Sequence, residues 1–216
     1  MTIKPYQHDS TNLVYNLLFC DDPELFKRDL HEPYPYPFDI VFSKNATVRD
    51  LENVITDSSL ETRARLLAYN KLLSIGGAPS KKELLAVVVE VGLDEGLDTL
   101  ASFRDGSARY IHYTEKIIIW ETSEDQEAND MTDQLFQDSL NIVKQIGPWG
   151  KPRKQNPPPG NVRLSFLVSD GIYFGEGPIN VLFNDPMAKP ALDKATELMQ
   201  FLTRRSLADN YIEPSV

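Results

Sequence analysis

Residues 103–113, Phe-Arg-Asp-Gly-Ser-Ala-Arg-Tyr-Ile-His-Tyr, contain the group of polar side chains that is best suited to chemistry in this chain. If this stretch ends in a strand, the alternation of side chains puts Tyr110 and His112 on one face. Trp120 follows on the next predicted strand. A titratable imidazole beside a phenol and an indole is typical of a small-molecule pocket wall. The simpler interpretation is an exposed sheet face with amphipathic side chains.

A second group of side chains is acidic. Residues 121–138 contain seven Asp or Glu residues and no Lys or Arg. Glu124, Asp125, Glu127 and Asp130 stand where a helix is expected to begin. The helix dipole favours each exposed carboxylate there by about 0.3–1 kcal/mol, so a charged helix start explains most of the group. The same carboxylates would attract a basic protein partner.

The residue types that bind metals or act as nucleophiles are too scattered to form a local motif. His8, His31 and His112 are not at metal-ligand spacing, and Cys20 is the single cysteine, which excludes a local zinc motif. Gly-x-Ser-x-Gly is absent. Cys20 is expected on the apolar face of a helix, where a thiol is usually inert. We predict no catalytic residue, no metal and no cofactor, which favours a protein without enzymatic activity.

The formal net charge of −10 is unevenly distributed along the chain. Residues 1–146 hold 25 Asp or Glu and 14 Lys or Arg, whereas residues 147–216 hold 7 and 8. An acidic surface repels phosphate backbones, so we expect no nucleic-acid partner.

Trp149, close to Lys151, Arg153 and Lys154, has the ingredients of a contact with single-stranded nucleic acid. Three positive charges on a protein with a net charge of −10 are few for such a contact. Pairing of these cations with the chain's own acidic helix, or with a protein partner, is the simpler interpretation.

The elements that must position these side chains fall into four segments of one α+β domain, residues 1–216. Residues 1–80 are mostly helical, 81–146 form a strand meander plus a helix, 147–160 form a Pro-rich loop, and 161–205 form a hairpin plus a helix. We expect a mainly antiparallel sheet of about six or seven strands with helices packed on it, built as two strand-plus-helix halves. The predicted strands are residues 84–91, 97–104, 107–113, 116–121, 162–168, 172–174 and 179–183.

Local signals mark the turns and helix ends. Asp105-Gly106 and Asp170-Gly171 each favour a tight turn, so Gly106 and Gly171 are expected between antiparallel strands. Residues 175–178, Gly-Glu-Gly-Pro, are expected to be a turn between two strands. Residues 150–159 are expected to be an exposed, mobile loop because their prolines interrupt backbone pairing.

The helices are predicted from apolar spacing and capping residues. Leu13, Leu17 and Cys20 recur at helical spacing within residues 10–20. Residues 47–50, 58–61 and 123–126 begin with a hydroxyl residue that can cap a helix, and only the last two carry the Glu or Gln of a full capping box.

The expected location is the cytoplasm. No secretory leader is evident, the longest apolar runs are too short to cross a bilayer, and one cysteine fits a reducing compartment. We therefore expect no membrane partner.

Two hypotheses for function follow. The first is a non-catalytic protein-binding or regulatory protein, of the adaptor or immunity type, that uses its acidic surface to bind a basic protein partner. The alternative is a small-molecule-binding sensor or enzyme with a pocket near Tyr110, His112 and Trp120.

Overall fold

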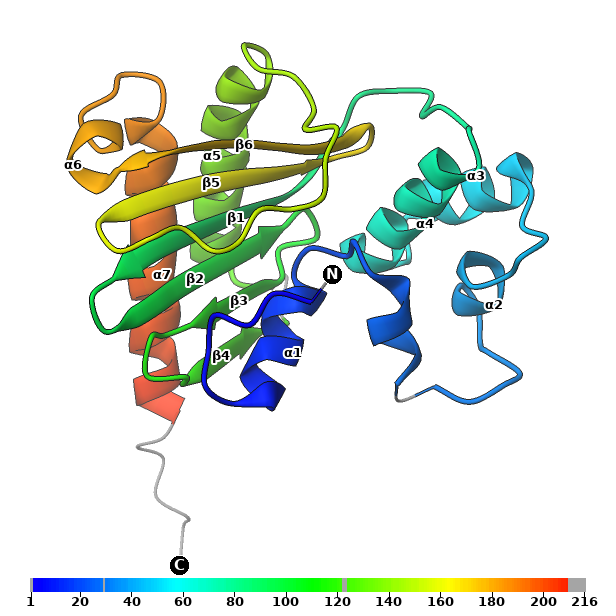
Figure 1. The fold of residues 1–216 in the computed structure, drawn as a ribbon, viewed down its shortest axis with the longest axis horizontal. Helices are drawn as coiled ribbons and strands as arrows, with labels where there is room; N and C mark the ends of the chain where they lie inside the picture. The colour runs from blue at the N-terminus through cyan, green and yellow to red at the C-terminus, as the bar shows by residue number, and fades with distance from the viewer. Residues whose placement is uncertain (1, 29, 122–123, 210–216) are drawn as a thin grey trace, which may run out of the picture.

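The computed structural model describes residues 2–28, 30–121 and 124–209 (Figure 1). In chain order the elements are α1 (Asp9–Leu17), η1 (Pro23–Lys27), α2 (Phe38–Val41), α3 (Val48–Thr56), α4 (Thr62–Ser74), β1 (Leu84–Leu93), β2 (Gly96–Phe103), β3 (Ala108–Ile111), β4 (Ile117–Trp120), α5 (Gln126–Val143), β5 (Asn161–Val168), β6 (Gly171–Pro178), α6 (Ile179–Leu182) and α7 (Lys189–Asp209). None of the helices in this described part is both long enough and apolar enough to span a bilayer.

A six-stranded sheet in the order β4-β3-β2-β1-β5-β6 forms the centre of the molecule. Every neighbouring pair of strands is antiparallel. Strands β1 to β4 form the predicted meander, and β5 pairs with β1, so both halves of the chain share one sheet. The predicted α+β fold, an antiparallel sheet with helices packed on it, is confirmed.

Helices cover both faces of the sheet (Figure 1). The amphipathic helices α5 and α7 pack on one face, where Val87 and Val89 of β1 contribute to their core. The N-terminal helices pack on the opposite face against Leu85 and Val88. Because β1 is buried on both faces, it is a nearly continuous apolar run rather than an alternating one.

Both predicted glycine turns are present. Gly106 has a φ of +86° between β2 and β3, and Gly171 has a φ of +134° directly after the β5–β6 turn. The first turn is longer than the two-residue turn that Asp-Gly favours, because Phe103 N donates to the Ser107 carbonyl around three intervening residues. A glycine at the last of these positions accommodates the positive φ without steric cost.

The prediction of a strand over residues 179–183 is wrong, because residues Ile179–Leu182 form the short helix α6. Ile179 and Leu182 pack against the α5–α7 core, whereas Val181 is 54% exposed. Apolar residues three apart therefore point inward, which is a helical period. Residues 175–178 are not a turn either: they complete β6, opposite Arg163 and its neighbours on β5.

Helix α1 buries a different face from the expected one. Asn12, Tyr15 and Asn16 are almost completely buried, whereas Leu13 and Leu17 are only half-buried. Asn12 and Asn16 are tolerated there because both accept hydrogen bonds from backbone N–H groups of the preceding segment, at 3.0 and 3.1 Å. Polar residues can thus face a core when the backbone supplies their partners.

Candidate functional site

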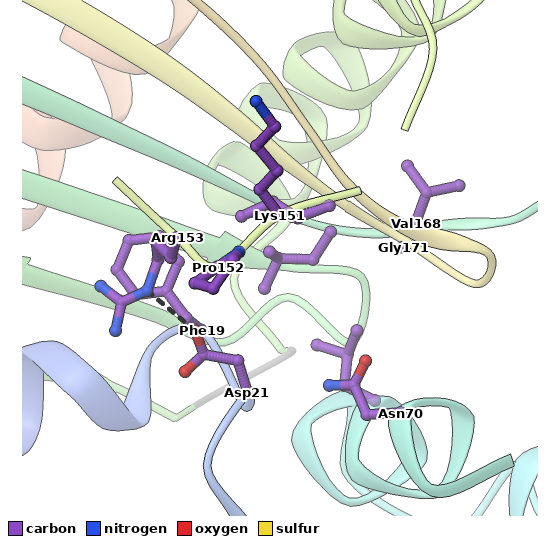
Figure 2. Close-up of a pocket in the computed structure, with 11 residues that line it drawn as sticks. Phe19, Asp21, Asn70, Lys151, Pro152, Arg153, Val168 and Gly171 are labelled. Atoms are coloured by element: carbon purple, nitrogen blue, oxygen red, sulfur yellow. Dashed lines mark hydrogen bonds and ion pairs between the residues drawn. The ribbon is translucent and has the colours of Figure 1, made fainter. Parts of the chain in front are cut away.

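Two neighbouring cavities lie beside α4, one between the N-terminal helices and the β5–β6 hairpin and the other among the N-terminal helices themselves. Each has a volume of about 250 Å³. They share Asp21 and Asn70 in their linings and are therefore neighbours, and we call the pair the N-terminal groove. The first cavity is lined by the turn after α1, α4, the Pro-rich segment (residues 147–160), β5 and β6 (Figure 2). The second is lined by the same turn, η1, α2 and α4.

The turn after α1 sets the position of Asp21. The expectation that Cys20 lies on a helix is wrong, because α1 ends at Leu17 and Cys20 adopts a positive φ of 51° that reverses the chain in the turn beyond it. Asn70 on α4 donates from Nδ2 to the Cys20 carbonyl at 2.7 Å and holds this turn against α4. Arg153 then donates from Nε to Asp21 Oδ2 at 2.9 Å, so the Pro-rich segment is tied to the N-terminal turn.

Arg153 anchors the Pro-rich segment beside the first cavity. Its side chain is 6% exposed, and its guanidinium lies 3.8 Å from the centroid of the Phe19 ring, as Figure 2 shows. Nη2 donates to Asn16 Oδ1 at 2.8 Å. Residues 152–158 have no regular structure, as predicted, but Arg153 is enclosed and Pro157 is buried. The expectation of an exposed loop is therefore wrong at these two positions, because the ring, Asp21 and Asn16 replace water around the guanidinium.

A buried row of charges crosses the sheet beside this anchor. Glu90 on β1 is opposite Arg163 on β5, and Arg163 is opposite Glu176 on β6. Arg163 Nη1 lies 3.5 Å from Glu90 Oε2, while its Nε and Nη2 donate to Glu176 Oε2 at 2.9 and 2.7 Å. Nη2 also donates to the Gln155 carbonyl at 2.5 Å. Arg163 therefore links three elements: β1, β6 and the Pro-rich segment.

Glu90 is fully buried, and Tyr15 Oη donates to its Oε1 at 2.6 Å. Burial raises the pKa of Glu90, although the Tyr15 hydrogen bond and the nearby Arg163 charge oppose this effect. The folded protein therefore holds the Glu90 proton more tightly than the unfolded chain does, where the pKa is about 4.3. The stabilisation associated with protonated Glu90 is complete below that pH and is lost as the pH rises through the folded-state pKa.

We therefore expect Glu90→Gln to gain stability relative to wild type as the pH rises above about 4.3, because the amide cannot ionise. Urea unfolding of both proteins between about pH 4 and 8 measures this difference. A difference in unfolding free energy that stays constant across the range would contradict the prediction.

Tyr110 and His112 lie close together on the sheet, with ring centroids 6.1 Å apart. Tyr110 is 5% exposed, and its hydroxyl donates to Asp98 Oδ2 at 3.1 Å. It lines a cavity of about 60 Å³ between the sheet and α7. Ligand pockets usually measure about 300–1,000 Å³, so this cavity is small for a ligand.

His112 and Trp120 do not line that cavity. His112 Nδ1 is 2.7 Å from the Thr114 hydroxyl, and Trp120 packs edge-on against Phe201 of α7 with ring centroids 5.4 Å apart. The structure thus gives Trp120 a packing contact at the α7 interface and leaves Tyr110 as the cavity-lining member of the three.

The four predicted acidic residues lie at the start of α5, but they differ in their surroundings. Asp125 is the N-cap: its Oδ1 accepts from Ala128 N at 3.1 Å, and its Oδ2 pairs with Arg205 of α7 at 2.9 Å. Glu124, Glu127 and Asp130 are exposed. The capping box predicted from residue 123 falls on a position outside the described residues, and Asp125 supplies the cap.

Metal and thiol chemistry receive little support from the geometry. Within residues 2–28, 30–121 and 124–209, no group of three or more His, Cys, Asp or Glu side chains is arranged to hold a metal ion. His8 Nδ1 lies 2.8 Å from Glu115 Oε2 at the surface. The Cys20 thiol is fully buried, and burial raises its pKa well above the usual range, which disfavours the reactive thiolate.

No family model matches the chain, and no curated protein is significantly similar to it. Function is therefore inferred from three features of the structure: the N-terminal groove, the buried charges beside it and the acidic start of α5.

The groove residues were only partly visible in the sequence. Arg153 belongs to the noted Trp149–Lys154 cluster, but its partner is Asp21, 132 residues away, and not the acidic helix. Asn70 lies in a helix with no local feature that marks it. Contacts between residues so far apart in the sequence leave no recurring pattern among neighbouring residues, so local spacing does not reveal them.

Proposed function

We propose that this chain is a non-catalytic binding protein that engages a basic protein partner through the outer surface of α5. The proposal rests on two carboxylates of this surface whose charge is not paired within the described protein. Glu127 and Asp130 are exposed, and neither has an ion-pair partner among the described residues. Uncompensated surface charge of one sign raises the rate at which an oppositely charged partner associates.

The rest of the helix surface supports the same proposal. Ala128, Leu135 and Phe136 are buried in the core, so the acidic side is directed outward. Asp133 and Leu140 lie two helical turns apart on the outer side, and Leu140 is 36% exposed. An exposed apolar side chain on the same helix as exposed carboxylates suits a protein partner, whose interface combines apolar contacts with a polar rim.

The location and the exclusion of nucleic acid belong to this proposal. Cys20 is free and buried, which suits a reducing compartment such as the cytoplasm. A net charge of −10 disfavours a phosphate backbone as the partner.

The double variant Glu127→Lys/Asp130→Lys tests the acidic surface without removing the Asp125 cap. We expect it to slow association with the native partner about tenfold at low salt, because steering by the carboxylates is replaced by repulsion. The partner is first captured by cross-linking in cells of the source organism, and association is then measured by surface plasmon resonance at low and high salt. Wild-type association should weaken as salt rises.

A matched control is Glu52→Lys/Glu95→Lys, which makes the same change in net charge at two exposed positions on α3 and the β1–β2 turn. It should retain most of the wild-type rate, and circular dichroism should show both variants folded. The proposal is wrong if the captured partner is not basic, or if it associates with both double variants at the same rate.

A further inference from the structure

The N-terminal groove carries the opposite charge to the rest of the molecule. Its lining contains four cations, Lys27, Lys71, Lys151 and Arg153, and two anions, Asp21 and Glu24. The whole chain has a net charge of −10. A hollow with a surplus of one sign concentrates ligands of the other sign.

Ion pairs within the groove neutralise two of these four cations. Arg153 pairs with Asp21 at 2.9 Å, and Lys27 pairs with Glu24 at 2.5 Å. Lys71 and Lys151 have no carboxylate of the described residues within ion-pair distance. One uncompensated lysine therefore borders each cavity, Lys71 the second and Lys151 the first.

Lys151 lines the first cavity, but its ammonium group points away from Asp21 (Figure 2). Figure 2 shows its side chain extending from the Pro-rich segment away from Asp21, and its ammonium lies 5.5 Å from the Trp149 ring centroid. Four rotatable carbons let this ammonium turn toward a bound anion. Lys71 is half-buried on α4 and lines the second cavity, and its sequence neighbour Asn70 lines both cavities.

Apolar side chains form part of the groove walls, between the charged and polar ones. Phe19, Leu66, Leu167 and Ile172 line the first cavity, and Phe42 lines the second. Ligand sites typically combine such walls with a few placed polar groups and measure about 300–1,000 Å³. Each of the two neighbouring cavities, with a volume of about 250 Å³, lies near the lower end of that range and is large enough for a small molecule.

We propose that the N-terminal groove binds a small organic carboxylate with an apolar body. The body lies in the first cavity against Phe19 and Ile172. The carboxylate is directed toward Lys71 and Asn70, and Lys151 adds positive charge at the rim. This site is independent of the proposed partner surface, because α5 packs on the other face of the sheet.

The test uses calorimetry at pH 7 and low salt with four probes: 2-naphthoate, its neutral carboxamide, acetate and inorganic phosphate. We expect 2-naphthoate to bind, and the other three to bind at least about tenfold more weakly, since they lack either the charge or the apolar body. Lys71→Gln/Lys151→Gln should weaken naphthoate binding by about tenfold or more.

The control Lys44→Gln/Lys116→Gln removes the same charge from two exposed positions outside the groove, so it should bind as wild type does. Amide chemical shifts should change at Asn70 and Ile172 on addition of naphthoate. The proposal is overturned if no probe binds at about 10 mM, if phosphate or the carboxamide matches naphthoate, or if both double variants lose affinity equally. If the wild-type protein binds naphthoate but the amide chemical shifts change only outside the groove, the proposal is overturned as well. These results leave the α5 proposal untouched, since they do not involve Glu127 or Asp130.

Discussion

Arg163→Ala is expected to lower the free energy of unfolding by about 3–5 kcal/mol. The reason is the carboxylate that it would leave behind: Glu90 is fully buried, and Arg163, itself 4% exposed, is the cation that contacts it. The substitution also removes the donors to Glu176 and to the Gln155 carbonyl. Domains are typically stable by about 5–15 kcal/mol, so the loss would be a large share of the total.

Urea unfolding at neutral pH measures this loss, with Arg49→Ala as the control. Arg49 is exposed on α3, and its removal should change stability by less than about 0.5 kcal/mol. The double variant Glu90→Gln/Arg163→Met should recover part of the stability, because it removes the buried carboxylate that Arg163→Ala would leave unpaired at Glu90. Equal effects of Arg163→Ala and Arg49→Ala would show that the buried row of charges contributes nothing to folding.

Gly92→Ala is expected to displace the Pro-rich segment from the sheet. A Cβ at Gly92 would lie 2.3 Å from the Pro158 carbonyl oxygen and 2.8 Å from that of Pro157. Both contacts are with backbone, which cannot rotate away as a side chain can. Gly92 also accepts from Gly160 N at 2.9 Å, a bond that the displaced segment would lose. We expect a destabilisation of about 1–3 kcal/mol.

The displacement itself is measured by hydrogen exchange of the Gly160 amide, which donates to the Gly92 carbonyl and should exchange faster in Gly92→Ala. Gly175→Ala on β6 is the matched control, because a Cβ there would meet nothing within 4 Å. Unchanged exchange in Gly92→Ala, at a stability equal to that of Gly175→Ala, would mean that the segment is not held by this close approach.

The strands and hairpin turns were largely predictable from local sequence. β-Branched runs, short connections and the Asp-Gly dipeptides indicated the meander and the β5–β6 hairpin. Helix α5 was predictable from its apolar spacing, and its acidic side is exposed. These features depend on residues a few positions apart, so the chain encodes them before any tertiary contact forms.

Helix caps show where local reasoning ends. The predicted full capping box at residues 58–61 is absent: α4 begins at Thr62, whose N–H donates to Asp105 Oδ2 at 2.7 Å from the β2–β3 turn. Thr47, by contrast, forms a complete capping box: its hydroxyl accepts from Asp50 N, and the Asp50 carboxylate accepts from Thr47 N. A remote carboxylate replaces the local cap in α4 because the fold brings the β2–β3 turn to the helix start.

The groove and the charges beside it were decided by tertiary structure. Whether Arg163 faces Glu90 depends on strand register, which a shift of one residue would change. Whether Arg153 is a solvated loop residue or a buried anchor depends on the distant Phe19 and Asp21. Local spacing in the sequence thus determined the strands, the hairpin turns and the acidic side of α5, whereas only the packed fold brought together the distant residues of the groove, because their contacts form after the elements have docked.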